Sequence, residues 1–382
     1  MLFTAIKNTP LLRPNALPIS ANIGIICFIS AFPDINDILL NNAQVIFVID
    51  ADTEQLIELN DNILERKKRK VPVLPFAEIV SRIDLIFVFF HNNAQYHPIG
   101  QCWRYMRNVG YESFYTFMPI PHIDKGFDKG VLYTAYYPEY YIYNKDDLEK
   151  AYSMLNDEES KSVFAARIRA IISGSIGYLR VSAYEDYFHP LVKPELGDVI
   201  LDGGVSEDIN SQIAFIKTIG SGGKYFGFEP DPTGFCIANE SIKKSASYDN
   251  YELIPLGLWH RRDKLLFEML GQGTCATKIK KENSIECDVL PVDEFVESRD
   301  LNKVDFIKLD IEGAEFNALK GAIKTITKFR PKLAISLYHQ LQDLYFIPLF
   351  LKEICIDYEF YLGHHHSALP ETILYARPKI FI

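Results

Sequence analysis

The chain has 382 residues, of which 48% are hydrophobic and 24% charged, and its formal net charge at pH 7 is −10. This length suits two domains of ordinary size, and the composition is typical of a globular protein, not of a disordered or fibrous one. The negative charge argues against a nucleic-acid partner, because a broad nucleic-acid surface needs clustered lysine and arginine to displace counterions. We interpret the one basic run, at 66–70, as the solvated end of a helix.

The cysteine pattern and the apolar stretches indicate a compartment. The six cysteines are scattered without Cys-x-x-Cys spacing, so we expect neither a disulfide framework nor a zinc site. The apolar stretch at 19–32 is too short to span a bilayer and is followed by Pro33, which predicts a buried strand and no transmembrane segment. No compact basic region leads into it, so no signal peptide is predicted. These features favour a cytoplasmic protein.

In the N-terminal part, short apolar runs alternate with amphipathic stretches up to residue 118. The runs at 22–30, 44–50, 71–75 and 84–90 predict strands, and the stretches at 53–70 and 98–110 predict helices. Strands separated by helices indicate a parallel α/β sheet. We therefore predict a small parallel α/β domain over residues 1–118.

The middle part, 119–196, is rich in tyrosine and opens with Pro119 and Pro121. Apolar residues at helical spacing over 146–173 predict a helical segment. We interpret this part as a helical connector that lies over the cleft of the next domain.

The C-terminal part, 197–382, repeats the alternation of strand and helix with clearer turns. The predicted strands are 199–202, 224–229, 251–259, 304–310, 332–338, 358–364 and 371–377, and the predicted helices are 206–219, 233–245, 314–328 and 341–356. A hairpin-like insertion covers 264–289. The short loop before the final strand allows an antiparallel pair, so the fold class is α/β, with a doubly wound, mostly parallel sheet and an antiparallel edge strand.

The first strand of this part ends in an acid and two glycines, Asp202-Gly203-Gly204. Glycine at such a point lets the backbone turn tightly and lets a ligand approach the main chain, because no Cβ intrudes. The next apolar strand ends at Glu229, where an acid can accept both ribose hydroxyls of an adenosine. The two motifs together predict a nucleoside site, although ordinary turns of an α/β domain can produce the same letters.

Acids also follow the strand at 304–310, in Asp310-Ile311-Glu312, and ligands of open α/β sheets lie at this carboxyl edge. Asp310 and Glu312 could orient an acceptor hydroxyl, act as a base, or hold a divalent ion through oxygen ligands. Glu315 stands in the first turn of the following helix, where a carboxylate also suits the helix dipole.

Histidines end the next two strands. His339 follows the strand at 332–338 and is a candidate base, with a hydrogen-bonded structural role as the alternative. Three consecutive histidines, 364–366, end the strand after it, and at most two of them share a side. If the protein holds a metal, the predicted ligands are Asp310, His364 and His366.

At these residues the chain resembles the FkbM-type methyltransferases, a family of S-adenosylmethionine-dependent O-methyltransferases that often act on sugars, glycans or polyketides. The matching phrases are ILDGG (200–204), FGFEPDP (226–232), PLGLW (255–259), DFIKLDIEGAE (305–315), LKGA (319–322), RPKLAISLYH (330–339) and YLGHHH (361–366). The resemblance covers about 186–378 and implies the class I methyltransferase fold. It implies cofactor-binding roles for Asp202, Gly203, Gly204, Glu229, Pro230, Asp231 and Gly257. It also implies that Asp310, with the nearby Glu312 and His339, forms the acceptor site.

The chain departs from this pattern at one position. Such methyltransferases commonly have a further glycine four residues after Gly204, where this chain has Asp208, with Glu207 beside it. Negative side chains there would repel the methionine carboxylate of the cofactor. A binding or scaffold protein that has lost activity is therefore the alternative to an enzyme.

The N-terminal part resembles the Rossmann-like domain that precedes some of these methyltransferases, with 45–52 as its second strand and acid. Its first strand leads into Ala31-Phe32-Pro33-Asp34 and not into a glycine loop, so the phosphate cradle is missing. We expect this domain to serve packing, acceptor presentation or the formation of a homo-oligomer. A nucleotide-sugar-modifying enzyme built on this sheet is the least favoured reading.

The leading hypothesis is an S-adenosylmethionine-dependent O-methyltransferase whose partner is a small-molecule or glycan acceptor. An acceptor hydroxyl would attack the sulfonium methyl group in line, and catalysis would come mainly from proximity and alignment. Asp310 or His339 would take the hydroxyl proton.

Overall fold

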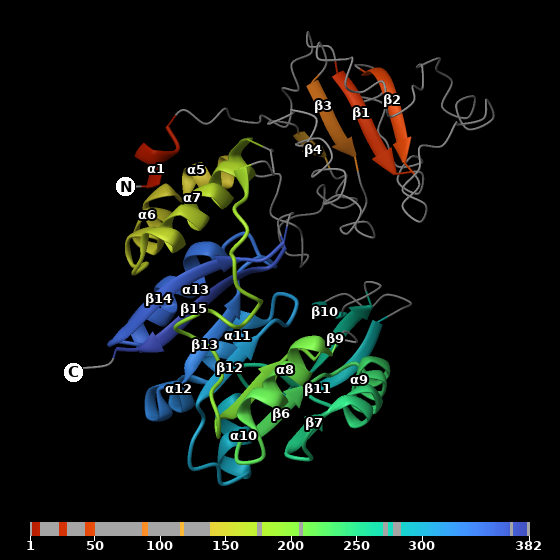
Figure 1. The fold of residues 1–382 in the computed structure, drawn as a ribbon, viewed down its shortest axis with the longest axis vertical. Helices are drawn as coiled ribbons and strands as arrows, with labels where there is room; N and C mark the ends of the chain where they lie inside the picture. Colours follow the sequence, from red (N-terminus) through yellow and green to blue (C-terminus); the bar gives the residue numbers. More distant parts are fainter. Residues whose placement is uncertain are drawn as a thin grey trace, which may run out of the picture.

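A seven-stranded sheet organises the C-terminal part of the computed structural model (Figure 1). In spatial order its strands are β14 (Tyr358–His364), β15 (Thr372–Pro378), β13 (Lys332–Ser336), β12 (Phe306–Leu309), β5 (Val199–Gly203), β6 (Lys224–Phe228) and β7 (Tyr251–Ile254). Every neighbouring pair is parallel except the two pairs of β15, which runs antiparallel to β13 and to β14. The predicted α/β class with a doubly wound sheet is confirmed, and the inverted strand lies one position inside the edge strand β14.

The structure describes residues 2–7, 23–28, 43–49, 86–90, 115–117, 138–173, 178–205, 209–269, 274–277, 284–366 and 370–379. Within these ranges, no helix combines the length and the apolar composition that crossing a bilayer would require.

Helices cover both faces of the seven-stranded sheet because successive strand residues point to opposite faces. Ile200 and Phe306 pack in one hydrophobic cluster, and their neighbours Leu201 and Ile307 pack in another. The first cluster contains residues of α8 (Asn210–Ile219) and α9 (Pro232–Ser245). The second contains residues of α10 (Val292–Ser298), α11 (Glu315–Lys320), α12 (Ile323–Phe329) and α13 (Asp343–Ile354).

The helix predicted over 314–328 is divided into α11 and α12 at Gly321. A Cβ on Gly321 would lie 2.2 Å from the carbonyl oxygen of Trp259, so the chain interrupts the helix where another backbone segment presses against it. The predicted insertion forms a second sheet in the order β10 (Thr274–Thr277), β9 (Asp263–Met269), β11 (Ser284–Leu290) and β8 (Gly257–Leu258). The single strand expected over 251–259 is accordingly split between β7 and β8, one in each sheet.

The middle part contributes helices that share the core of the large sheet. These are α5 (Pro138–Tyr143), α6 (Lys145–Ser153) and α7 (Glu158–Ser173), which Figure 1 shows beside α13 and β14. Leu148 and Phe164 belong to the same hydrophobic cluster as Leu351 of α13 and Phe360 of β14. Helix α1 (Leu2–Ala5) joins this layer through the backbone amides of Leu2 and Phe3, which donate to the carboxylate of Glu149 at 2.9 Å each.

A separate four-stranded parallel sheet forms in the N-terminal part, in the order β2 (Ala43–Ile49), β1 (Ile23–Phe28), β3 (Ile86–Phe90) and β4 (Tyr115–Phe117). Three of these strands match predicted ones, and β4 was not predicted. The strand expected at 71–75, the helices at 53–70 and 98–110, and the segment 31–34 lie outside the described residues.

Candidate functional site

A cavity of about 160 Å³ lies where the strand order of the large sheet changes direction. The chain proceeds from β5 to β6 and β7 on one side and from β12 to β13 on the other, so the switch point falls between β5 and β12. Ligands of open α/β sheets bind in the crevice at this point. Six of the predicted site residues line the cavity: Gly204, Glu229, Pro230, Gly257, Asp310 and Glu312.

The turn after β5 depends on glycine. Gly204 has a φ of +86°, and a Cβ there would lie 1.8 Å from the carbonyl oxygen of Asp310. The backbone amide of Asp310 donates to the carbonyl oxygen of Gly203 at 3.1 Å. The close approach of these two segments therefore brings the first and third sequence motifs together.

Asp202 lies beneath this turn and does not line the cavity. Its fully buried carboxylate accepts hydrogen bonds from the Tyr225 hydroxyl at 2.7 Å and from Gln212 Nε2 at 3.3 Å, both to Oδ2. Its other oxygen, Oδ1, is 3.0 Å from Lys308 Nζ. With both oxygens engaged inside the protein, Asp202 supports the turn, and a direct contact to the predicted cofactor is not favoured.

Lys308 of β12 is a site residue that the sequence reasoning missed. Its ammonium group donates to the carbonyl oxygens of Gly203 and Gly204, at 3.1 and 2.6 Å, in addition to its ion pair with Asp202. Burial opposes the charge, yet Asp202 and Asp310 raise the pKa of Lys308 above its usual range. The available signal was a lysine inside an otherwise apolar strand. Its position opposite Asp202 is set by the register of β12 on β5 in the folded sheet.

Glu229, at the end of β6, lines the cavity with Pro230. The backbone amide of Asp231 donates to Glu229 Oε1 at 2.8 Å, and burial raises the pKa of Glu229 to about 7. The side chain of Asp231 instead caps α9, where Oδ1 accepts from the amide of Thr233 at 3.0 Å. Asp231 therefore positions Glu229 through its main chain, and its own carboxylate is not part of the cavity lining.

Two tyrosines hold Asp310. The hydroxyls of Tyr187 and Tyr338 donate to its Oδ2 and Oδ1 at 2.7 and 2.9 Å. Although burial opposes ionisation, Lys308, His339 and these two hydroxyls lower the pKa of Asp310 below its usual range. Tyr187 comes from the middle part of the chain, precedes β5 and also lines the cavity. The predicted connector thus supplies a residue to the site, and no sequence motif marked it.

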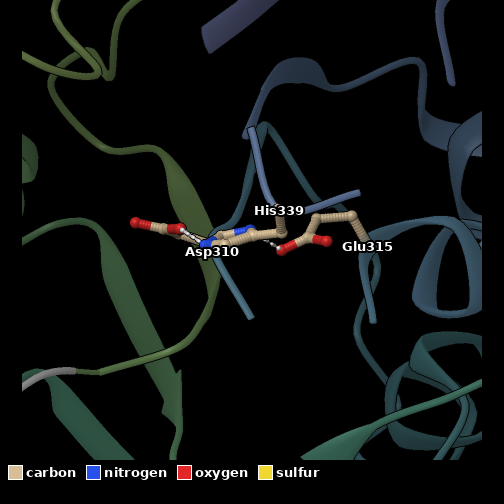
Figure 2. Close-up of side chains that lie close together, drawn as sticks. All are labelled: Asp310, Glu315 and His339. Atoms are coloured by element: carbon tan, nitrogen blue, oxygen red, sulfur yellow. Dashed lines mark hydrogen bonds and ion pairs between the residues drawn. The ribbon is translucent and has the colours of Figure 1, made fainter. Parts of the chain in front are cut away.

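His339 lies between two carboxylates, as Figure 2 shows. Its Nδ1 is 2.9 Å from Glu315 Oε1, and its Nε2 is 3.5 Å from Asp310 Oδ1. Burial would lower its pKa, but the negative charges of Glu315, Glu312 and Asp310 raise the pKa of His339 to about 10. Without a bound cation the imidazolium form dominates at neutral pH, and it has no lone pair for a proton. This environment does not favour the predicted role of His339 as a base.

Glu312 projects into the cavity from a tight turn. It has a left-handed φ of 54°, a conformation that is uncommon for a residue with a side chain, and Gly313 follows with a φ of 93°. The Glu312 side chain is 39% exposed, and its Oε2 is 3.5 Å from His339 Nε2. Burial raises the pKa of Glu312 above its usual range.

Two further carboxyl groups lie near Asp310. Burial and the charge of Asp310 raise the pKa of Asp186 to about 6 and that of Glu371 to about 8. Glu371 is therefore mostly protonated at neutral pH, and its Oε1 lies 3.2 Å from the Tyr338 hydroxyl. Asp186 and Glu371 thus add to the carboxyl groups around Asp310, where Lys308 and His339 supply the opposing positive charges.

The predicted metal ligands do not come together. Among the described residues, the group of acids and histidines close enough to share an ion is Asp310, Glu315 and His339, whose ligand atoms lie within 4.8 Å of one another. His364 and His366 are not in this group. His364 is buried, and its Nδ1 lies 2.8 Å from Thr372 Oγ1. Asp208, the departure from the family pattern, lies outside the described residues.

Comparisons with known proteins find similarity to methyltransferases. Residues 204–366 match the methyltransferase FkbM domain. Hexuronic acid methyltransferase AglP of Haloferax volcanii is 30% identical over 136 residues, which cover 34% of this chain and 52% of AglP. The chain thus spans about half the length of this relative. The crystal structure of methyltransferase FkbM from Methylobacillus flagellatus KT shares the fold, with a TM-score of 0.62 at 18% identity over 98% of this chain and 97% of that one.

Proposed function

We propose that the cavity binds S-adenosylmethionine and that the protein methylates a hydroxyl oxygen, because residues 204–366 match the methyltransferase FkbM domain. The observation that carries this proposal is the position of Glu229 and Asp310 on the lining of one cavity at the switch point of the sheet. We assign Glu229 to the ribose of the cofactor and Asp310 to the acceptor.

The residues present fit the proposed cofactor. Glu229 Oε1 is held by the Asp231 amide, which leaves Oε2 free to accept from ribose hydroxyls. Leu258 and Trp259 line the cavity together with Pro230 and provide apolar walls for a purine. The absence of a Cβ at Gly204 lets the turn after β5 pack directly against the Asp310 backbone at the cavity lining. When bound, S-adenosylmethionine supplies an electrophilic methyl group on a positively charged sulfur.

The chain's own residues would orient the acceptor and move its proton. Asp310 is fixed by two tyrosine hydroxyls, so it can accept a hydrogen bond from an acceptor hydroxyl in a set direction. Glu312 lines the same cavity and is partly exposed, with Oε1 free to take the proton as the oxygen attacks. We assign proton removal to Glu312 and orientation of the acceptor to Asp310, in place of the expectation that Asp310 or His339 takes the proton.

The carboxylates on the cavity lining suit an acceptor with hydroxyl groups. AglP is named as a hexuronic acid methyltransferase, which suggests a sugar acceptor for this chain as well. Asp310 and Glu312 line the cavity, and carboxylates accept hydrogen bonds from the hydroxyls of a sugar. We therefore propose a hydroxyl of a carbohydrate or a similar polar metabolite.

Isothermal titration of the purified protein with S-adenosylmethionine and its demethylated product tests the first step. We expect saturable binding of both, and we expect Asp310→Asn to bind the cofactor while losing turnover of a hydroxyl acceptor. A folded wild-type protein that binds neither compound would instead support the alternative, a scaffold with a methyltransferase fold. Unchanged turnover in Asp310→Asn would remove Asp310 from the chemistry.

A further inference from the structure

One side chain on the cavity lining has a buried polar atom without a partner. Gln212 of α8 lines the cavity and is 2% exposed, and its Oε1 accepts no hydrogen bond from the described part of the chain. Among the described residues that line the cavity, no other has such a buried side-chain nitrogen or oxygen. A buried polar atom without a partner is costly, so a ligand that donates to this oxygen would stabilise the site.

Asp202 fixes the orientation of the Gln212 amide. Gln212 Nε2 lies 3.3 Å from Asp202 Oδ2, and the Asp202 carboxylate is paired with Lys308. Such a carboxylate only accepts hydrogen bonds, so the nitrogen of the amide and not its oxygen faces Asp202. Gln212 lines the cavity, whereas Asp202 does not. Oε1 is therefore the polar atom of this side chain that remains for a ligand.

The cavity lining follows the order of the strands. Leu258 and Trp259, proposed for the purine, come after β7, and Glu229, proposed for the ribose, follows β6. Gln212 lies in the first turn of α8, the helix that follows β5. Because β7, β6 and β5 are consecutive neighbours in the sheet, a nucleoside bound at the first two extends its amino-acid portion toward β5 and α8. The hydrogen-bond donor in that portion of S-adenosylmethionine is its ammonium group.

We propose that Oε1 of Gln212 accepts a hydrogen bond from the ammonium group in the methionine portion of S-adenosylmethionine. This contact rests on the proposed function and adds a cofactor-binding residue to it. Asp202, the acid predicted to bind the cofactor, is fully buried and paired with Lys308, so it does not serve this cation directly. Gln212 then lets the cavity distinguish the cofactor from nucleosides that lack an amino group on the sulfur substituent.

Two nucleosides that differ in one amino group test the contact in the unaltered full chain. S-adenosylhomocysteine has the ammonium group, and its deaminated analogue has a hydrogen atom in that position. Isothermal titration should give a dissociation constant at least about tenfold larger for the analogue, because hydrogen bonds to charged groups are stronger than those between neutral groups. Equal dissociation constants for the two compounds would overturn the proposal.

Gln212→Met removes the amide oxygen and keeps the length of the side chain. It should weaken the binding of S-adenosylhomocysteine at least about tenfold and that of the deaminated analogue by less than about threefold. Tyr225→Phe is the matched control, because it removes another hydrogen bond to Asp202 Oδ2 from a residue that does not line the cavity. The ratio of the two dissociation constants should stay at its wild-type value in Tyr225→Phe. If Gln212→Met weakens both compounds equally, Gln212 acts only by supporting Asp202, and the proposed contact is wrong.

This contact and the proposed function fail in different ways. Wild-type protein that binds both compounds with equal dissociation constants removes the contact and leaves the cofactor site intact. Folded wild-type protein that binds neither compound refutes the proposed function, and the contact with it. The comparison of the two compounds on the wild type decides the question even if Gln212→Met does not fold.

Discussion

The buried ion pair between β5 and β12 offers the sharpest test of how the site is supported. Lys308→Met removes an ammonium group whose side chain is 3% exposed, from a carboxylate on Asp202 that is fully buried. Breaking such a pair from one side leaves an uncompensated charge and costs about 3–5 kcal/mol. The variant also leaves the Gly203 and Gly204 carbonyl oxygens without their shared donor. We therefore expect Lys308→Met to lower the free energy of unfolding by an amount in the upper part of this range.

Urea denaturation of Lys308→Met, read by circular dichroism, measures this loss as a shift in midpoint at constant slope. Lys303→Met is the matched control. Its ammonium group also pairs with an aspartate, Asp305, and donates to a backbone carbonyl, but the side chain is 47% exposed. A surface pair of this kind contributes less than about 1 kcal/mol.

A double substitution separates the charge from the packing. Asp202→Leu with Lys308→Met buries no charge, so it should be less destabilised than the sum of the two single variants. If Lys308→Met costs no more than Lys303→Met, the pair is not desolvated in solution and the account of the turn given above is wrong. If the destabilisation of the double variant equals the sum of the two single variants, Asp202 and Lys308 are not energetically coupled.

Two further changes probe the cofactor side. Gly204→Ala should abolish binding of S-adenosylmethionine in isothermal titration, because the new Cβ would lie 1.8 Å from the Asp310 carbonyl oxygen. Gly222→Ala is the control and should bind S-adenosylmethionine normally, because a Cβ at Gly222 meets no atom within 4 Å. Because burial raises the pKa of Glu229 to about 7 and ribose hydroxyls need its ionised form, affinity should fall as the pH drops through 7. Glu229→Gln should bind S-adenosylmethionine at least about tenfold more weakly, and its affinity should not change with pH in this range. If the variant keeps the pH profile of the wild type, Glu229 is not the group that binds the ribose.

Sequence reasoning succeeded where a local pattern fixes position. Apolar runs that end in acids locate Glu229 and Asp310 at the carboxyl edge, because parallel strands bring their carboxyl ends to one side. The strand and helix order predicted the doubly wound sheet in the same way. The break of the 314–328 helix at Gly321 was missed, since its cause is the backbone of Trp259, distant in sequence.

The interactions that define the site depend on contacts that no local pattern encodes. The pairing of Asp202 with Lys308 follows from the register of β5 and β12, which a single sequence does not give. The charge of His339 depends on three carboxylates that meet only after folding. The contact of Tyr187 with Asp310 joins residues 123 positions apart.

That last contact has a consequence for the diversity of acceptors. Under the proposed function, the cofactor side of the cavity is built by strands of both C-terminal sheets and their turns, whereas Asp310 takes one of its two hydroxyl partners from the segment that precedes β5. Proteins with the same sheet but a different preceding segment could therefore keep the nucleoside pocket while presenting Asp310 in another direction. If the proposed function holds, exchange of residues 178–198, which contain Tyr187, would change the acceptor while the sheet stays the same.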